Sequence, residues 1–284
     1  MNIFLLFLVI IGVSVQSISK KNYSIKNTDG DFTFITISIL TAFLMFLCIS
    51  GGRIEFCKEL MPYEIAYAIS YCAALIFSIL AIKTGPLAIS AFIYSCALII
   101  PSLYGIIILD ESVTIELVIG ISLLLISLMF INLKKKEETE KISSKWIICV
   151  ILSFVGNGAC STVQKVQQLA FEGCYKIELM IVALAISLIV MIVSSIVTEK
   201  GKILLNIKKA FPWALYCGLA NGAVNLLVLH MLNKLPSSVM FPVISAGEIV
   251  LTTSVSVFAY KEMLGKKQLI GLVIGIISLV FLNL

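Results

Sequence analysis

Charged side chains are scarce in this sequence: Asp, Glu, Lys and Arg make up 13% of its 284 residues. Apolar residues make up 60%, and the mean hydropathy is +1.09. One water-soluble core cannot hide that much apolar surface. Because a helix needs about 20 mostly apolar residues to cross a bilayer, a chain of this length can make about ten crossings with little left over. The composition therefore predicts an all-α integral membrane protein without a soluble domain.

Metal ligands and paired cysteines are also lacking. The sequence has one histidine, His230, and its eight cysteines include no CxxC pair. Six of the cysteines fall inside apolar stretches: Cys48, Cys72, Cys96, Cys149, Cys160 and Cys217. We therefore expect no disulfide, no metal site and no cofactor.

A continuous basic surface is lacking too, although the net charge is +5. The lysines lie in short stretches between apolar runs, which argues against a nucleic-acid partner. Lysines in such positions anchor helices at lipid headgroups, so the lipid bilayer is the expected partner.

The apolar residues gather into ten runs that are each suited to one membrane crossing. These runs cover residues 2–18, 32–51, 62–82, 86–109, 113–133, 146–168, 177–198, 212–230, 236–260 and 266–283. No positive charge precedes the first run, whereas Lys20 and Lys21 follow it. We therefore expect a retained first helix rather than a cleaved signal peptide.

A repeated pattern divides the runs into five and five. Three polar or glycine positions recur at identical spacing, namely Glu111, Gly120 and Asn132 in one half and Glu262, Gly271 and Asn283 in the other. A weaker echo aligns residues 17–20 with 162–165. Internal duplication predicts a first repeat over 1–133, a charged linker over 134–145 and a second repeat over 146–284. Because each repeat has an odd number of helices, the fold expected is ten transmembrane helices as two inverted five-helix repeats.

These features resemble the drug/metabolite transporter superfamily in its EamA-like branch. The resemblance rests on ten helices in two fives, on a lysine that ends the first helix, Lys20, and on Glu111 and Glu262 with a glycine nine residues after each. It covers nearly the whole chain. The resemblance implies carrier activity, not enzymatic activity, on a small metabolite or drug, and its degenerate motifs leave the cargo open.

Glu248 is the foremost candidate for a functional residue. It lies near the middle of the run 236–260, on one helix face with Ser245 and Thr252. A carboxylate deep in a bilayer is costly unless it is paired or hydrated. We expect Glu248 to couple transport to protons or to bind a cationic substrate. The alternative is a structural acid paired with a neighbouring helix, such as through Lys165.

Amides and a tyrosine complete the predicted substrate site. Asn157 and Gln164 belong to one polar stripe of the run 146–168, and Asn221 and Asn225 are four residues apart in the run 212–230. Cavity lining and interhelical hydrogen bonding at about 1 kcal/mol per bond both stay open for these amides. Tyr71 follows Tyr63 and Tyr67 at intervals of four residues, beside Glu64. It lies deep enough to stack on a planar or cationic group.

Other residues have expected structural roles. Gly218 and Gly222 form a small-xxx-small pattern that allows close helix packing. Lys165 is expected to extend to a membrane interface. Glu111 and Glu262 are expected to complement the starts of the helices that follow them.

Together these features predict a secondary active transporter, proton-coupled or an exchanger, of a small metabolite or drug. It would work by alternating access as a multi-pass protein of a bacterial cell membrane. A small-molecule substrate is the expected partner, and the sequence leaves a homo-oligomer open. The alternative is a non-transporting or lipid-flipping subunit of a larger assembly. A membrane-embedded enzyme is disfavoured, because the sequence shows no converging acids, nucleophile–histidine pair or metal cluster.

The lysines also predict an orientation. Loops after the odd-numbered runs hold Lys20, Lys21, Lys26, Lys83, Lys134, Lys135, Lys136, Lys141, Lys145, Lys200, Lys202, Lys208, Lys209, Lys261, Lys266 and Lys267. The other side has Arg53, Lys58, Lys176 and Lys234, with Lys165 nearby. By the positive-inside rule both termini lie outside the cytoplasm, whereas the family resemblance implies termini inside. A reporter that fluoresces only in the cytoplasm, fused after Leu284, should therefore stay dark; bright cells would contradict this orientation.

Overall fold

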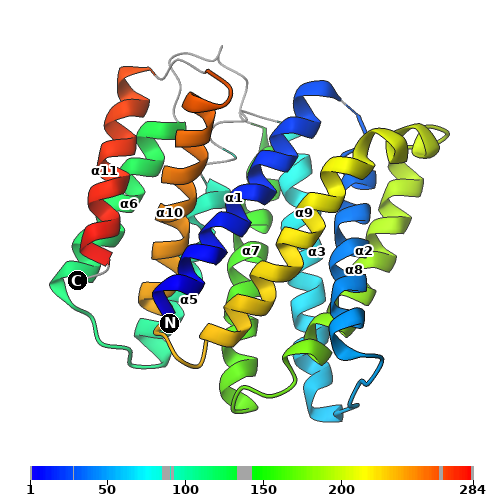
Figure 1. Cartoon of the computed structure of the whole chain (residues 1–284), viewed down its shortest axis with the longest axis horizontal. Helices are drawn as coiled ribbons and strands as arrows, with labels where there is room; N and C mark the ends of the chain where they lie inside the picture. The colour runs from blue at the N-terminus through cyan, green and yellow to red at the C-terminus, as the bar shows by residue number, and fades with distance from the viewer. Residues whose placement is uncertain are drawn as a thin grey trace. The chain divides into compact units, whose positions relative to one another are not determined.

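The computed structural model describes residues 2–27, 29–84, 90, 93–132, 143–261 and 265–282, which are helical with short connections and contain no strand. In chain order the helices are α1 (Asn2–Lys26), α2 (Asp31–Ser50), the 3₁₀ helix η1 (Lys58–Leu60), α3 (Met61–Thr84), the 3₁₀ helix η2 (Cys96–Leu98), α5 (Ile99–Ile108), α6 (Ile115–Asn132), α7 (Ser144–Ala170), α8 (Lys176–Thr198), α9 (Ile203–Met231), α10 (Ser237–Phe258) and α11 (Lys266–Leu282) (Figure 1).

Seven segments among the described residues are long and apolar enough to cross a bilayer. They are Ile3–Lys26, Asp31–Ser50, Lys58–Thr84, Ser144–Ala170, Lys176–Thr198, Ile203–Met231 and Ser237–Val255. Two shorter apolar helices cover Ile93–Ile108 and Ile115–Phe130. The all-α membrane class is thus confirmed, while the count of ten crossings stays a prediction.

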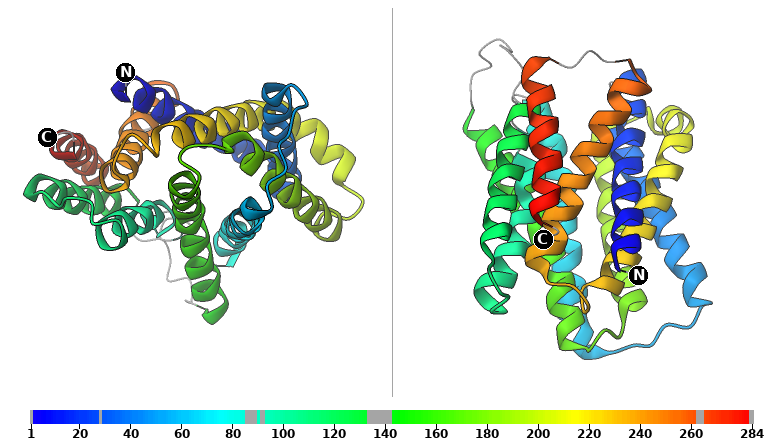
Figure 2. Two further views of the ribbon diagram at one scale, coloured as in Figure 1. Left: turned by 90° about the horizontal axis from the view of Figure 1, so that it is seen from below. Right: turned by 60° about the vertical axis from the view of Figure 1, so that its left-hand side comes forward.

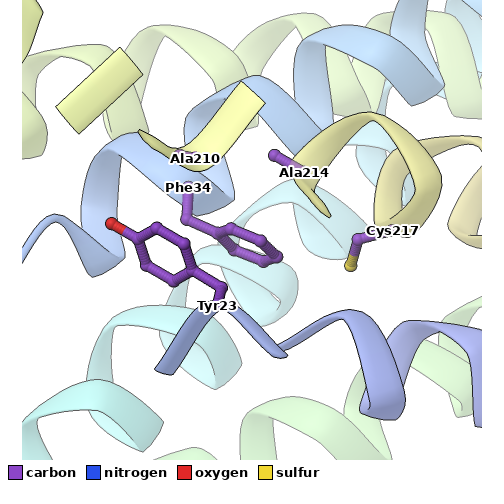
Figure 3. Packing of buried hydrophobic residues seen from close by; sticks show 5 residues of the cluster. All are labelled: Tyr23, Phe34, Ala210, Ala214 and Cys217. Carbon is purple, nitrogen blue, oxygen red and sulfur yellow. The ribbon is translucent and has the colours of Figure 1, made fainter. Parts of the chain in front are cut away.

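Two helices extend well beyond the apolar runs that predicted them. Helix α1 continues through both lysines after its run to Lys26, and α9 begins at Ile203, before the run 212–230. Packing holds these extensions: Tyr23, in the added part of α1, is 2% exposed, and its ring stacks on Phe34 of α2 at 4.8 Å between centroids. Figure 3 shows this pair beside Ala210 of α9. Hydropathy finds the part of a helix that lies in lipid, and tertiary contacts decide where the helix ends.

The chain divides into two compact units, and each takes helices from both halves of the sequence. The first unit comprises Met1–Cys72 and Val163–Asn233, and the second comprises Ala73–Thr162 and Lys234–Leu284. Helices α3 and α7 each pass from one unit to the other. The predicted repeats, 1–133 and 146–284, describe a duplication of sequence and stay a prediction. Most of the predicted linker lies outside the described residues.

In the first unit, α9 packs closely against α1 and α2. The pattern that predicted close packing is confirmed at this contact. A Cβ atom added to Gly218 would lie 2.4 Å from the backbone oxygen of Ser38, and one added to Gly222 would lie 2.7 Å from Met45 Sδ. The absence of side chains at both positions lets α9 and α2 approach each other closely.

Glu199 holds the start of α2 in the same unit. Its Oε1 accepts hydrogen bonds from the backbone N–H groups of Phe32 (2.8 Å) and Thr33 (3.1 Å). Its other oxygen accepts one from Asn206 of α9 at 2.9 Å. A carboxylate here satisfies N–H groups that the helix itself cannot pair, and it complements the helix dipole.

Glu111 plays the corresponding part in the second unit. Its carboxylate oxygens accept hydrogen bonds from the backbone N–H groups of Ser237 (2.9 Å) and Ser238 (2.8 Å), at the start of α10. The expectation that Glu111 complements the helix that follows it is wrong, because its carboxylate bonds to the start of α10 and α6 begins only at Ile115. Glu262 lies outside the described residues.

Helices α6 and α11 lie side by side in the second unit (Figure 2). Two reciprocal hydrogen bonds join them. Ser127 Oγ donates to the carbonyl of Gly271 at 2.7 Å, and Ser278 Oγ donates to the carbonyl of Gly120 at 2.8 Å. The two serines have the same separation along the chain as the two glycines. Equivalent residues therefore exchange equivalent bonds across this helix pair.

The close approach at Gly218 generates a stability prediction. Gly218→Ala should lower the free energy of unfolding by about 1–3 kcal/mol, because its Cβ would press on backbone that cannot rotate away. Gly265→Ala is the control, since an added Cβ there meets only Gln268 Oε1 at 3.8 Å. Thermal unfolding of the purified variants in detergent measures the difference. Equal midpoints for Gly218→Ala and the wild type would contradict the packing described.

Candidate functional site

A buried polar network in the first unit is the candidate functional site. It joins five side chains from three helices, α3, α7 and α9. Its members are Tyr67, Tyr71, Gln164, Asn221 and Asn225, and we call it the amide–phenol network.

Asn225 is at the centre of the amide–phenol network. Its Oδ1 accepts hydrogen bonds from Tyr67 Oη (3.1 Å) and Gln164 Nε2 (2.8 Å). Its Nδ2 donates to Asn221 Oδ1 at 2.8 Å, and Asn221 Nδ2 donates to Tyr71 Oη at 2.7 Å. The hydrogen bonds therefore run continuously from one helix to the next.

The network is well shielded and contains no charged group. Tyr67 is 2% exposed, Gln164 3% and Asn221 9%, while Tyr71 and Asn225 are half-buried. The rings of Tyr67 and Tyr71 stack with centroids 5.7 Å apart. Gln164 Oε1 accepts no hydrogen bond from any described residue. The network thus contains stacked aromatic rings and one acceptor, Gln164 Oε1, that no described residue uses.

Four of the six predicted site residues meet here: Tyr71, Gln164, Asn221 and Asn225. Tyr67 is the network member that was not predicted from the sequence. The spacing of tyrosines in the run 62–82 could have identified Tyr67, because it places this residue one helical turn from Tyr71. The role of these residues in binding a substrate stays a prediction.

Asn157 belongs to the second unit, whereas the network members belong to the first. It is half-buried, and its Nδ2 donates a long hydrogen bond, 3.5 Å, to the carbonyl of Tyr94. The adjacent Gly158 packs against the start of α5, where an added Cβ would lie 2.4 Å from Ile100 Cδ1. These contacts favour helix packing as the role of this stretch of α7.

Glu248 also lies in the second unit, half-buried on α10. Ser245, on the same face, is 4% exposed. Thr252 directs its hydroxyl to the backbone carbonyl of Glu248, at 2.7 Å. One turn before Glu248, an enclosed cavity of about 10 Å³ is lined in part by Ser95, Pro242 and Ser245. That volume suits about one water molecule.

Lys165 does not extend to an interface, so that expectation was wrong. It is 5% exposed, and its Nζ donates to the carbonyl of Leu232 at 2.9 Å, at the C-terminal end of α9. Helix α7 continues to Ala170, which places Lys165 inside the helix rather than at its end. A positive charge there complements the carbonyls that end α9.

Within the described part of the chain, no group of three or more His, Cys, Asp or Glu side chains is arranged to hold a metal ion. The amide–phenol network itself consists of amides, phenols and the hydrogen bonds between them.

Comparison with known proteins identifies the family. Residues 144–284 match the model of the EamA-like transporter family, whereas no curated protein matches the chain. A solved structure described as "Crystal structure of protein" is similar in fold, with a TM-score of 0.77 over 99% of this chain and 95% of its own. At 12% identity, that similarity concerns the fold alone. Through its second half, the chain is a member of the EamA-like transporter family, part of the drug/metabolite transporter superfamily.

Proposed function

We propose that the chain is a secondary active transporter of a small molecule in the cell membrane of a bacterium. The observation that carries this proposal is the amide–phenol network, which lies between helices apolar enough to cross a bilayer. Membership of the EamA-like transporter family supports transport of small molecules over enzymatic chemistry.

The proposal includes ten crossings arranged as two inverted five-helix repeats. The reciprocal serine bonds between α6 and α11 support a local two-fold relation. A second correspondence supports the weaker repeat at the start of each half. The N-cap residues of α2 and α8, Gly30 and Tyr175, both have positive φ, 97° and 57°. They have the same separation along the chain as the aligned residues 17–20 and 162–165. Inverted halves allow a site to open alternately to each side of the membrane.

The energetics of the network suit reversible binding. Hydrogen bonds between transmembrane helices contribute only about 0.6 kcal/mol each on average. A substrate with hydroxyl or amino groups can therefore replace individual bonds of the network at small cost. A site closed by strong ion pairs would release its substrate more slowly.

Asn225→Ala tests the role of the network. The change removes the shared partner of Tyr67, Gln164 and Asn221, so uptake should fall roughly tenfold. The ligand is first found as the metabolite that most raises the apparent melting temperature of the purified protein. Its uptake is then measured in liposomes that contain only this protein.

Tyr216→Phe is the matched control, because Tyr216 is on the same helix but 59% exposed. It should transport like the wild type. Wild-type liposomes that bind the ligand but never accumulate or exchange it would contradict the transporter assignment.

We further propose that Glu248 couples transport to a proton gradient. Glu248→Gln keeps the size of the side chain but removes its ionisable group, so expression and helix content should be preserved. Uptake driven by a pH gradient should be abolished, while ligand exchange without a gradient continues. Gradient-driven uptake equal to that of the wild type would rule out this coupling role.

A further inference from the structure

Glu64 is a buried acid of the first unit that the proposed function does not yet use. It lies in the first turn of α3 and is 5% exposed. Its carboxylate makes no hydrogen bond or ion pair with any described residue. Other carboxylates of the molecule are used differently, since Glu111 and Glu199 each pair with backbone N–H groups.

The position of Glu64 links it to the amide–phenol network. Tyr67 and Tyr71 follow it at intervals of three and seven residues, which places all three side chains on one face of α3. Glu64 is therefore one turn from Tyr67, toward the beginning of the helix. The network and the carboxylate form one continuous strip.

A second acid lies near Glu64, and an aromatic cluster begins at the preceding residue of the chain. Its electrostatic neighbour is another acid, Glu178, in the first turn of α8. The ring of Tyr63, beside Glu64 in the chain, meets the edge of Phe171 at 5.7 Å, and Phe171 meets Tyr175 at 5.6 Å. Aromatic faces attract cations, as does a pair of carboxylates.

A carboxylate with 5% of its surface exposed, beside a second acid and without a hydrogen-bond partner among the described residues, favours the approach of a positive charge. Building on the transport function proposed above, we propose that the substrate is an organic cation, a protonated amine or a quaternary ammonium. Glu64 binds its charge, and Tyr67 and Tyr71 contact its body. The amides of the network then bind its polar groups.

The test uses four probes of similar size that differ in charge. Phenethylamine and benzyltrimethylammonium are cations, phenethyl alcohol is neutral, and hydrocinnamate is an anion. Binding to the full chain in nanodiscs is measured by calorimetry at one pH and without any gradient. Both cations should bind, with the alcohol and the anion at least about tenfold weaker. The quaternary probe carries no acidic proton, so its binding separates a cation site from a proton site.

The Glu64→Gln substitution should weaken the binding of both cations at least about tenfold. Glu172→Gln is the matched control: this acid belongs to the same unit, but its side chain is exposed, and its loss should leave binding unchanged. Because Glu64 makes no hydrogen bond with any described residue, the Glu64→Gln variant should have a melting temperature equal to or above that of the wild type. A marked loss of stability would indicate a structural acid and overturn the proposal.

A wild-type measurement keeps the proposal testable if the variant does not fold. A hydrophobic carbodiimide should modify Glu64, and benzyltrimethylammonium should slow that modification, as read by mass spectrometry of the peptide. The proposal is overturned if neither cation binds, if Glu64→Gln binds them as tightly, if the alcohol binds as tightly as the amine, or if the modification is not slowed.

Binding and transport can fail separately. Cation binding that depends on Glu64 without uptake into liposomes would leave this inference standing and remove the transporter assignment. If the protein takes up other compounds but binds neither cation, the transporter assignment stands and the organic-cation proposal falls.

Discussion

Lipid offers no hydrogen bonds, so each buried polar group of a membrane protein must find its partner within the protein. Much of this structure follows from that constraint. Glu199 and Glu111 pair with the N–H groups that begin α2 and α10, and Lys165 pairs with a carbonyl that ends α9. At Gly218 the backbones of two helices come into direct contact. Their polar backbone atoms are already hydrogen-bonded within each helix, so this contact leaves no polar group unpaired.

The same constraint explains why the amide–phenol network and Glu64 differ in what they imply. The network satisfies itself: Asn225 both accepts and donates, and its partners are neutral groups. Its hydrogen bonds are made within the protein, and the proposed function has a ligand exchange with some of them. Glu64 has no such arrangement, although it is 5% exposed and near a second acid. Among the described residues, the buried Lys165 is paired with a carbonyl whereas the buried Glu64 is not, and a cation from outside the protein is the partner proposed for Glu64.

Sequence reasoning predicted the helices well because crossing a bilayer needs a long apolar run, which hydropathy measures directly. It predicted the helix ends less well, because contacts such as Tyr23 on Phe34 extend a helix past its apolar part. It placed Tyr71, Gln164, Asn221 and Asn225 among the site candidates from polarity at helical spacing. It could not show that they bond to one another, and it assigned Glu111 to the wrong helix, since such partners come from distant parts of the chain.

The proposed duplication would affect helix packing and the candidate site differently. Ser127 and Ser278 bond reciprocally across α6 and α11, so replacing either one would break the equivalence of the helix pair. The network has no such counterpart: with α3 and α9 aligned on Lys83 and Lys234, Asn225 corresponds to Ala74, which is buried and apolar. A contact between equivalent helices needs the same residue in both copies, whereas a site that must fit an asymmetric molecule gains from polar groups in one copy only. Recognition is therefore expected where the repeats differ, and packing where they agree.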